Sequence, residues 1–259
     1  MQLRETFDTA AELYDRIRPG YPPQLYEDLL AIAGLERGAR LLEIGPGTGQ
    51  ATLPLANRGF VITAVELGPG LASVARRNLA AFPSVRIEVA DFETWTSPPE
   101  PFDMVYSATA FHWLDHDTRL DRCADVLRPG GWLAVWENGH VAGGDAQFWV
   151  DVQDCYERWD PATPPGLRLP EPSTVPDQDL GLETCGRFGA PFTRRYFWTR
   201  RYTRDQYLDI LQTYSGHIAL PEPNRSELFA CVGSLIDSRY DGAVTKGYLT
   251  RLTVAQRLP

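Results

Sequence analysis

The feature that most constrains the fold of this 259-residue chain is the segment LLEIGPGTGQ at residues 41–50. An apolar stretch with strand character runs there into a turn with a glycine at every second position. Glycine adopts backbone dihedrals that other residues avoid, and it carries no Cβ atom that would keep a ligand away. Such a turn, between a buried strand and the start of a helix, holds a nucleotide-like cofactor at the carboxyl edge of a parallel α/β sheet.

The spacing of the glycines bears on which cofactor binds. Gly45, Gly47 and Gly49 differ from the dinucleotide fingerprint, which places its third small residue one position later, at Gln50. Since Ala51 follows directly, the spacing disfavours a nicotinamide-dependent oxidoreductase without excluding it.

Strand and helix patterns alternate along the first 137 residues, which is typical of βαβ units and a mainly parallel sheet. Strands are predicted at residues 40–45, 60–65, 85–89, 102–106 and 132–136. Helices are predicted at residues 24–33, from the glycine turn to about Asn57, at 70–81 and at 115–127.

The second half of the chain has a different texture. Helical patterns occupy residues 145–159, 203–214 and 224–240, the proline-rich stretch 160–182 is predicted to be a loop, and residues 192–202 and 248–254 alternate like two neighbouring strands. The sequence therefore predicts a Rossmann-like α/β fold, with a seven-stranded, mostly parallel sheet, an antiparallel last strand and a cap of helices and loops. The predicted core comprises residues 1–139, 192–202 and 243–259, and the predicted cap comprises residues 140–191 and 203–242.

Composition narrows the class of protein. The formal net charge of −9 argues against general binding to nucleic acid, which needs clustered Lys and Arg side chains. We interpret the single lysine, Lys246, as a coding bias toward arginine. Four cysteines are scattered without a CxxC pair, which argues against a metal site and against a small disulfide framework: Cys123, Cys155, Cys185 and Cys231.

The sequence also carries no targeting signal that we recognise. No apolar run approaches the ~18 residues of a membrane span. Residues 1–5 lack the basic-then-apolar pattern of a secretion signal. We therefore expect a cytoplasmic protein without a membrane partner, present as a monomer or a homodimer.

Three acidic residues mark successive predicted strand ends: Glu43 at the first, Glu66 at the second and Asp91 just past the third. The carboxyl ends of parallel strands lie side by side, so these acids can face one ligand. Glu66 stands 21 residues after Gly45, where a carboxylate can accept hydrogen bonds from both ribose hydroxyls, and Phe92 beside Asp91 suits an adenine ring. No Lys or Arg lies near the turn, and phosphate favours cationic partners, so an adenosine with a positive sulfonium fits better than a polyphosphate.

The chain resembles the class I S-adenosylmethionine-dependent methyltransferases over residues 7–137 and the final strand. The matching pieces are EIGPGTG at 43–49, Glu66, the Asp91–Phe92 pair and LRPGG at 127–131. Two further segments, YDRIRPGYP at 14–22 and ATAFHW at 108–113, are similar to the trans-aconitate-methyltransferase-like branch.

The resemblance implies S-adenosyl-L-methionine as the cofactor. We predict methyl transfer to a small-molecule acceptor, on a carboxylate or a hydroxyl of a secondary metabolite. The resemblance also implies that the glycine turn contacts the methionine part, that Glu66 binds the ribose, and that Tyr14 and Arg18 fold over the cofactor. The cofactor residues that it implies are Tyr14, Arg18, Glu43, Gly45, Gly47, Gly49, Glu66, Leu67, Asp91, Phe92 and Ala108.

Several alternatives stay open. His112 is a candidate general base because histidine titrates near neutral pH, but it suits a structural hydrogen bond beside Trp113 equally well. The same fold can bind the cofactor without methylating, as a cyclase or a scaffold. The arginine-rich segment 187–204 suits an anionic substrate, although its alternation with aromatic residues favours a solvated strand face. Five aromatic residues suit either an apolar acceptor pocket or the core: Trp113, Phe148, Trp149, Trp198 and Tyr214.

Overall fold

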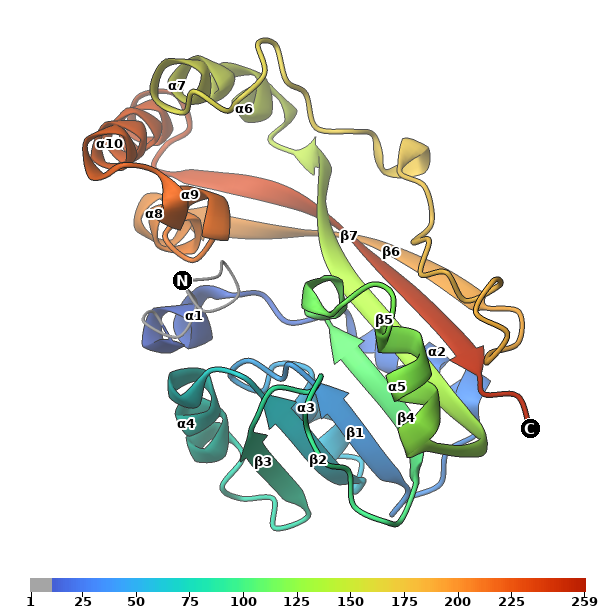
Figure 1. Cartoon of the computed structure of the whole chain (residues 1–259). Coiled ribbons are helices and arrows are strands. Elements are labelled where there is room, and N and C mark those ends of the chain that lie inside the picture. The colour runs from blue at the N-terminus through green and yellow to red at the C-terminus, as the bar shows by residue number, and fades with distance from the viewer. Residues whose placement is uncertain (1–10) are drawn as a thin grey trace. The chain divides into compact units, whose positions relative to one another are not determined.

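The computed structural model describes residues 11–259 and confirms the predicted seven-stranded α/β fold (Figure 1). The strands are β1 (Arg40–Ile44), β2 (Val61–Glu66), β3 (Val85–Val89), β4 (Phe102–Ala108), β5 (Leu127–Gly144), β6 (Phe192–Thr203) and β7 (Ala243–Gln256). Their order in the sheet is β3-β2-β1-β4-β5-β7-β6. The first five strands pair in parallel, and the last two strands of the chain, β6 and β7, run antiparallel to each other.

Residues 1–10 lie outside the described residues. The start of the predicted core and the predicted lack of a secretion signal fall on them.

The described helices are α1 (Ala11–Ile17), α2 (Pro23–Ala33), α3 (Thr52–Ala56), α4 (Pro69–Asn78), α5 (Arg119–Val126), α6 (Ala146–Asp151), α7 (Gln153–Trp159), α8 (Arg204–Leu211), α9 (Ser215–Ala219) and α10 (Glu222–Arg239), with 3-10 turns η3 (Phe111–Trp113) and η4 (Pro172–Thr174). Local sequence explains several of their ends. Helix α2 starts with Pro23, where no backbone N–H is needed, and ends at Gly34 in the left-handed region. Helix α8 starts with a capping box in which Thr203 and Gln206 exchange hydrogen bonds.

Two predicted elements differ from the structure. The helix predicted at 145–159 is divided into α6 and α7 on either side of Val152. Strand β5 begins before the predicted residue 132, because Leu127 already pairs with Phe102 of β4. The register shifts before Trp132 pairs with Met104, so the Pro- and Gly-containing segment between them is an irregularity within the strand rather than the end of it.

The described chain divides into two compact units. The sheet unit comprises residues 19–138, 177–196 and 250–259, and the helical unit comprises residues 11–18, 139–176 and 197–249. Strands β5, β6 and β7 each contribute residues to both. The division into a core and a cap that the sequence suggested stays a prediction.

The sheet unit buries apolar side chains on both faces of its strands. Successive residues of a strand point to opposite faces. Leu41 therefore packs with Leu25 and Leu55, whereas the next residue, Leu42, packs in a second cluster with Cys123 of α5. Burial on both faces is typical of parallel sheets covered by helices, and it leaves the carboxyl ends of the strands as the place for a ligand.

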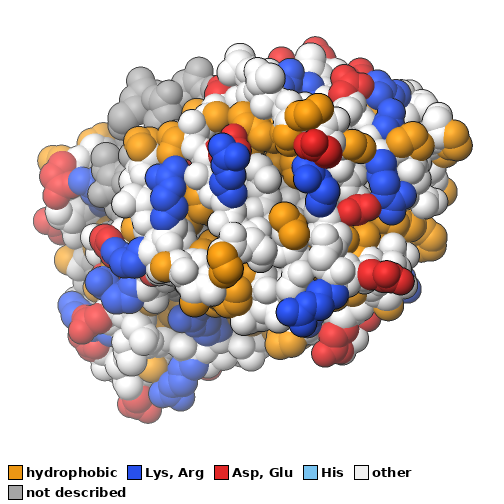
Figure 2. Space-filling view, turned by 90° about the horizontal axis from the view of Figure 1, so that it is seen from below, with side chains coloured by type: hydrophobic (Ala, Val, Ile, Leu, Met, Phe, Trp, Pro, Cys, Tyr) orange, Lys and Arg blue, Asp and Glu red, His pale blue; other side chains and the backbone are white. Residues whose placement is uncertain are grey.

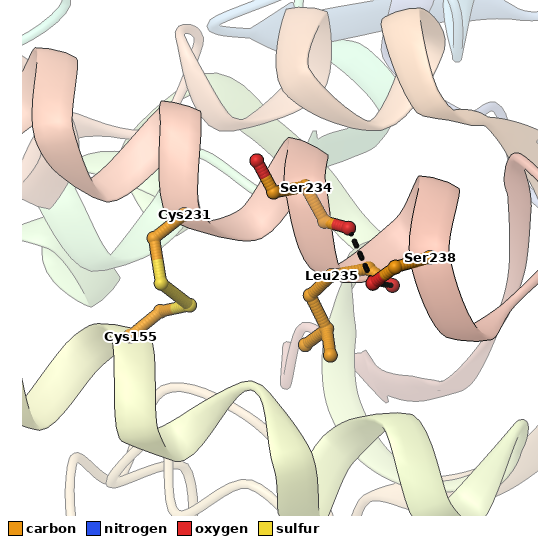
Figure 3. The surroundings of a disulfide bond; sticks show 5 residues. All are labelled: Cys155, Cys231, Ser234, Leu235 and Ser238. Atoms are coloured by element: carbon orange, nitrogen blue, oxygen red, sulfur yellow. Dashed lines mark hydrogen bonds between the residues drawn. A yellow bond between two sulfur atoms is a disulfide. The ribbon is translucent and has the colours of Figure 1, made fainter.

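The helical unit has its own core, built from Phe148 of α6, Tyr207 of α8 and Val232 of α10 among others. A disulfide joins Cys155 of α7 to Cys231 of α10 (Figure 3). The sequence predicted no disulfide framework, and the separation of 76 residues gave no signal for this single pair. The other two cysteines, Cys123 and Cys185, carry free thiols.

The arginine-rich edge strand β6 alternates in burial from Arg195 onward. Arg195, Phe197 and Arg201 are exposed, whereas Tyr196 and Trp198 are half-buried and Tyr202 is buried. On the face of the molecule seen in Figure 2, basic side chains are likewise dispersed among acidic and apolar ones. Within residues 11–259 no helix combines the length and the hydropathy needed to cross a bilayer.

Candidate functional site

The glycine turn after β1 has the backbone that its sequence predicts. Gly45, Gly47 and Gly49 all have positive φ angles, of 68°, 60° and 96°. A Cβ atom on Gly45 would lie 2.6 Å from the Cβ of Ala110, which follows β4. The turn therefore requires glycine at this position for two reasons, its dihedral angle and its close approach to a neighbouring segment.

Glu66, the last residue of β2, binds this turn. Its Oε2 accepts a hydrogen bond from the N–H of Gly47 at 2.9 Å, and its Oε1 accepts one from the N–H of Gly68 at 2.9 Å. The residue is 6% exposed. A carboxylate has about four lone-pair sites, so it can accept further hydrogen bonds from ligand hydroxyls. Leu67, between Glu66 and Gly68, is half-buried.

Glu43 on β1 is fully buried. Its Oε2 accepts hydrogen bonds from the hydroxyls of Thr52 at 2.5 Å and Tyr106 at 2.7 Å, and its Oε1 has no partner within the described part of the chain. Burial raises the pKa of Glu43 to about 7. The side chain thus connects β1, the start of α3 and β4 inside the sheet unit, below the surface that a ligand would contact.

The residues after β3 lie at the same edge. Asp91 is half-buried, and its Oδ1 accepts a hydrogen bond from the N–H of Glu93 at 3.0 Å. Phe92 is 4% exposed, with its ring centroid 6.4 Å from that of Trp95 and 5.4 Å from the guanidinium of Arg122. Phe92 is therefore anchored in the core next to Asp91.

The end of β4 holds a strained residue that the sequence did not reveal. Thr109 follows the half-buried Ala108 and has φ of 58°, which is an outlier for a β-branched side chain. Its N–H donates to the carbonyl of Trp136 at 2.8 Å, and its Oγ1 shares a hydrogen bond of 2.8 Å with the hydroxyl of Tyr21. Strain of this kind concentrates at functional sites. The only sequence signal for Thr109 and Tyr21 was their place in the segments ATAFHW and YDRIRPGYP.

His112 lies in η3, immediately after this strand end, and its side chain is exposed. Its ring centroid lies 4.8 Å from that of Trp113. Partial desolvation lowers the pKa of His112, while Glu137 acts in the opposite direction. The imidazole is therefore neutral at pH 7 and can accept a proton.

Tyr14 and Arg18 belong to the helical unit, in contrast to the other predicted cofactor residues. Arg18 donates from Nε to Oγ1 of Thr213 at 2.9 Å and from Nη2 to the carbonyl of Thr213 at 2.6 Å. Its guanidinium also lies over the rings of Tyr14 and Tyr214, at 4.9 and 4.6 Å. The structure thus brings the residues at the ends of β1, β2 and β4 together in the sheet unit, and Tyr14 with Arg18 in the helical unit.

Comparison with known proteins shows which family the segment that carries this site matches. Residues 42–135, from β1 into β5, match the methyltransferase domain family. The uncharacterized methyltransferase Rv3342 of Mycobacterium tuberculosis (strain ATCC 25618 / H37Rv) is 29% identical over 233 residues, which cover 89% of this chain and 85% of that protein. The trans-aconitate 2-methyltransferase of M. tuberculosis (strain ATCC 25177 / H37Ra) is 35% identical over 120 residues, which cover 45% of this chain and 43% of that protein.

A solved structure agrees over the whole fold. A putative type II methyltransferase from Anaeromyxobacter dehalogenans has a TM-score of 0.63 and 25% identity, with 93% of this chain and 99% of that chain covered. Residues 42–135 therefore form a methyltransferase domain, and over most of its length the chain is similar to class I methyltransferases. The matched segment contains the glycine turn, Glu66, Asp91 and His112, whereas Tyr14 and Arg18 lie outside it.

Proposed function

We propose that this methyltransferase transfers the methyl group of S-adenosyl-L-methionine to a small-molecule acceptor, on a carboxylate or a hydroxyl. The observation that carries the proposal is the pairing of Glu66 with the backbone of the glycine turn. A nucleoside needs an acceptor for its ribose hydroxyls beside a backbone free of side chains, and this pairing supplies both.

The residues present suit an adenosine sulfonium. Glu66 would accept from the ribose hydroxyls, the half-buried Asp91 would accept from the adenine amino group, and the turn at 45–49 would leave room for the methionine part. S-adenosylmethionine supplies an electrophilic methyl group on its sulfur. The protein then contributes alignment and exclusion of water, which can provide much of the rate enhancement of a displacement. Glu43 is proposed to act indirectly, as a positioning residue for α3 and the turn.

His112 is proposed to accept the proton of a hydroxyl acceptor. It is exposed, it stands at the carboxyl end of β4, and its lowered pKa leaves it unprotonated at neutral pH. A His112→Asn variant should lower kcat for a hydroxyl acceptor and leave the Kd for S-adenosylmethionine unchanged. The contacts of Tyr14, Arg18, Leu67 and Ala108 with the cofactor remain predictions of the same proposal.

Two measurements test the proposed function. Calorimetric titration should show binding of S-adenosylmethionine and S-adenosylhomocysteine, and no binding of NAD. Incubation with methyl-labelled S-adenosylmethionine and a panel of small carboxylates and hydroxyl compounds should then give labelled product. Binding of NAD in preference to S-adenosylmethionine would overturn the cofactor assignment, and tight cofactor binding without transfer to any acceptor would overturn the assignment as an active methyltransferase.

A further inference from the structure

The only lysine of the chain is buried in the helical unit. Lys246 lies on β7 and is 2% exposed. Its Nζ donates to the hydroxyl of Tyr214 at 3.1 Å and lies 3.3 Å from Nε2 of His140. No ion pair among residues 11–259 includes Lys246, so the buried ammonium has no counter-ion within this described part of the chain.

The groups that face Lys246 add no negative charge. Three aromatic rings surround its Nζ, with centroids at 5.1 Å for Tyr214, 5.3 Å for Tyr248 and 5.7 Å for Trp149. The other titratable neighbours are Arg18, His140 and His217, which are cationic or neutral, and the phenols of Tyr202 and Tyr248, which bond to each other. Asp160 acts on His217, whose pKa it raises. Burial, together with Arg18, lowers the pKa of Lys246 to about 7.

An uncompensated buried ammonium is costly, and proteins normally supply it with a carboxylate or another anion. His140 is exposed, and its ring centroid lies 5.2 Å from that of Tyr214. A ligand that enters beside His140 would meet a charge that residues 11–259 leave unbalanced.

We infer that Lys246, Tyr214 and His140 form a binding site for a small organic anion, a carboxylate on a planar or apolar body. The ammonium and the phenol would bind the carboxylate, and the rings of Tyr214 and His140, which are not fully buried, would pack against the body of the ligand. A single ammonium among aromatic rings suits a carboxylate better than a phosphate, which favours several cationic partners. The inference goes beyond the proposed function and does not depend on it.

The single lysine permits a direct test on the full chain. Protein labelled at the lysine side chain gives one lysine Nζ signal in a nuclear magnetic resonance spectrum, and that signal belongs to Lys246. Benzoate should shift this signal and raise the midpoint of its pH titration, because a bound carboxylate favours the ammonium form. Neutral benzamide and inorganic phosphate should leave both unchanged. An unshifted signal at tens of millimolar benzoate, or an equal response to benzamide or phosphate, would overturn the inference.

Variants separate charge from packing. Lys246→Met removes the ammonium, keeps an unbranched apolar side chain and should weaken benzoate binding at least tenfold at pH 6.5, and Tyr214→Phe should weaken it several-fold. The control Arg168→Met removes an exposed charge from the same unit and should bind benzoate as the wild type does. Equal affinity of Lys246→Met and wild type would contradict the site. S-adenosylmethionine binding, measured on the same samples, tests the proposed function, and urea denaturation of each variant reports separately on fold integrity.

Discussion

The Oε2 atom of Glu66 accepts a hydrogen bond from the backbone N–H of Gly47 at 2.9 Å, which joins the last residue of β2 to the turn after β1. Its second oxygen accepts from Gly68, the residue before α4. One carboxylate therefore orders two backbone segments at the carboxyl edge of the sheet. Because charge-assisted hydrogen bonds to backbone N–H groups are strong, this arrangement fixes the turn before any ligand arrives.

Replacing Glu66 with Gln tests this arrangement. The amide has one acceptor oxygen, so its NH2 group would face one of the two backbone N–H donors that the carboxylate now binds. We expect the affinity for S-adenosylmethionine, measured by calorimetry, to fall about 10- to 100-fold. Glu36→Gln, an exposed change in the same unit, serves as the control and should leave the affinity unchanged. Unaltered affinity in the Glu66 variant would refute the assigned role.

Gly45→Ala should damage the turn through two separate effects. The φ angle of 68° costs an alanine about 1–2 kcal/mol. The new Cβ would also lie 2.6 Å from the Cβ of Ala110, and overpacking of this kind costs about 1–3 kcal/mol. Chemical denaturation should show both losses, and S-adenosylmethionine binding should weaken.

Gly34→Ala is a matched control for this variant. Gly34 has a similar φ of 59°, but a Cβ there would meet nothing within 4 Å. Its loss of stability should therefore equal the backbone contribution alone, with cofactor binding intact. Equal destabilisation of the two variants would show that the approach of Ala110 has no energetic weight.

Glu43 should make stability depend on pH. Its pKa in the folded protein, about 7, lies above the ordinary value of 4.5, so the folded state holds the proton more tightly than the unfolded state does. The contribution is fully present below pH 4.5 and is lost as the pH rises through 7. Wild-type protein should therefore lose free energy of unfolding across this window, by a few kcal/mol.

Glu43→Gln should remove this loss. The Gln side chain cannot ionise, and its oxygen can still accept from Thr52 and Tyr106. Urea denaturation between pH 4.5 and 7.5 should give a flatter profile for this variant than for wild type, whereas the exposed Glu36→Gln variant should keep the wild-type slope. Parallel profiles for Glu43→Gln and wild type would contradict the raised pKa.

Sequence patterns were sufficient to predict the parts of the fold that depend on residues close together in the sequence. The apolar run before Gly45 and the glycine spacing predicted β1 and its turn. Both features are visible in neighbouring residues, because a buried strand needs consecutive apolar residues and positive φ angles favour glycine. The acids after β2 and β3 were likewise placed at one edge, since parallel strands end together. Glu43 lies inside rather than on this edge, because alternation along β1 turns its side chain toward Thr52 and Tyr106.

Contacts between residues far apart in the sequence could not be predicted in this way. Arg18 bonds to Thr213, 195 residues away, and this contact depends on packing in the helical unit. The burial of Lys246 was also hidden, because the residue lies before the predicted strand 248–254 and a single lysine gives no sign of what packs around it. The strain at Thr109 follows from tertiary contacts with Tyr21 and Trp136 rather than from its own residue type.

Lys246→Met should stabilise the ligand-free protein. The folded pKa of about 7 lies below the ordinary 10.5, so between these values the unfolded chain binds a proton that the folded chain has lost. Wild-type stability should therefore rise with pH across this window, and the advantage of the methionine variant should be largest below pH 7 and vanish above 10.5. Thermal melts of both proteins from pH 6 to 10.5 measure the difference, and Arg168→Met should show no such gain.

The disulfide between Cys155 and Cys231 should account for much of the stability of the helical unit. It links α7 to α10 across 76 residues, and closing a loop of that length lowers the entropy of the unfolded chain enough to contribute about 4 kcal/mol. Protein reduced in denaturant and refolded with dithiothreitol should unfold at lower urea than oxidised protein. Cys231→Ser should unfold at the same urea concentration as the reduced protein, with or without dithiothreitol. Cys185→Ser, which removes a free thiol from the sheet unit, should lose stability on reduction as the wild type does. Identical unfolding of oxidised and reduced wild type would mean that packing of α7 on α10 alone holds this unit together.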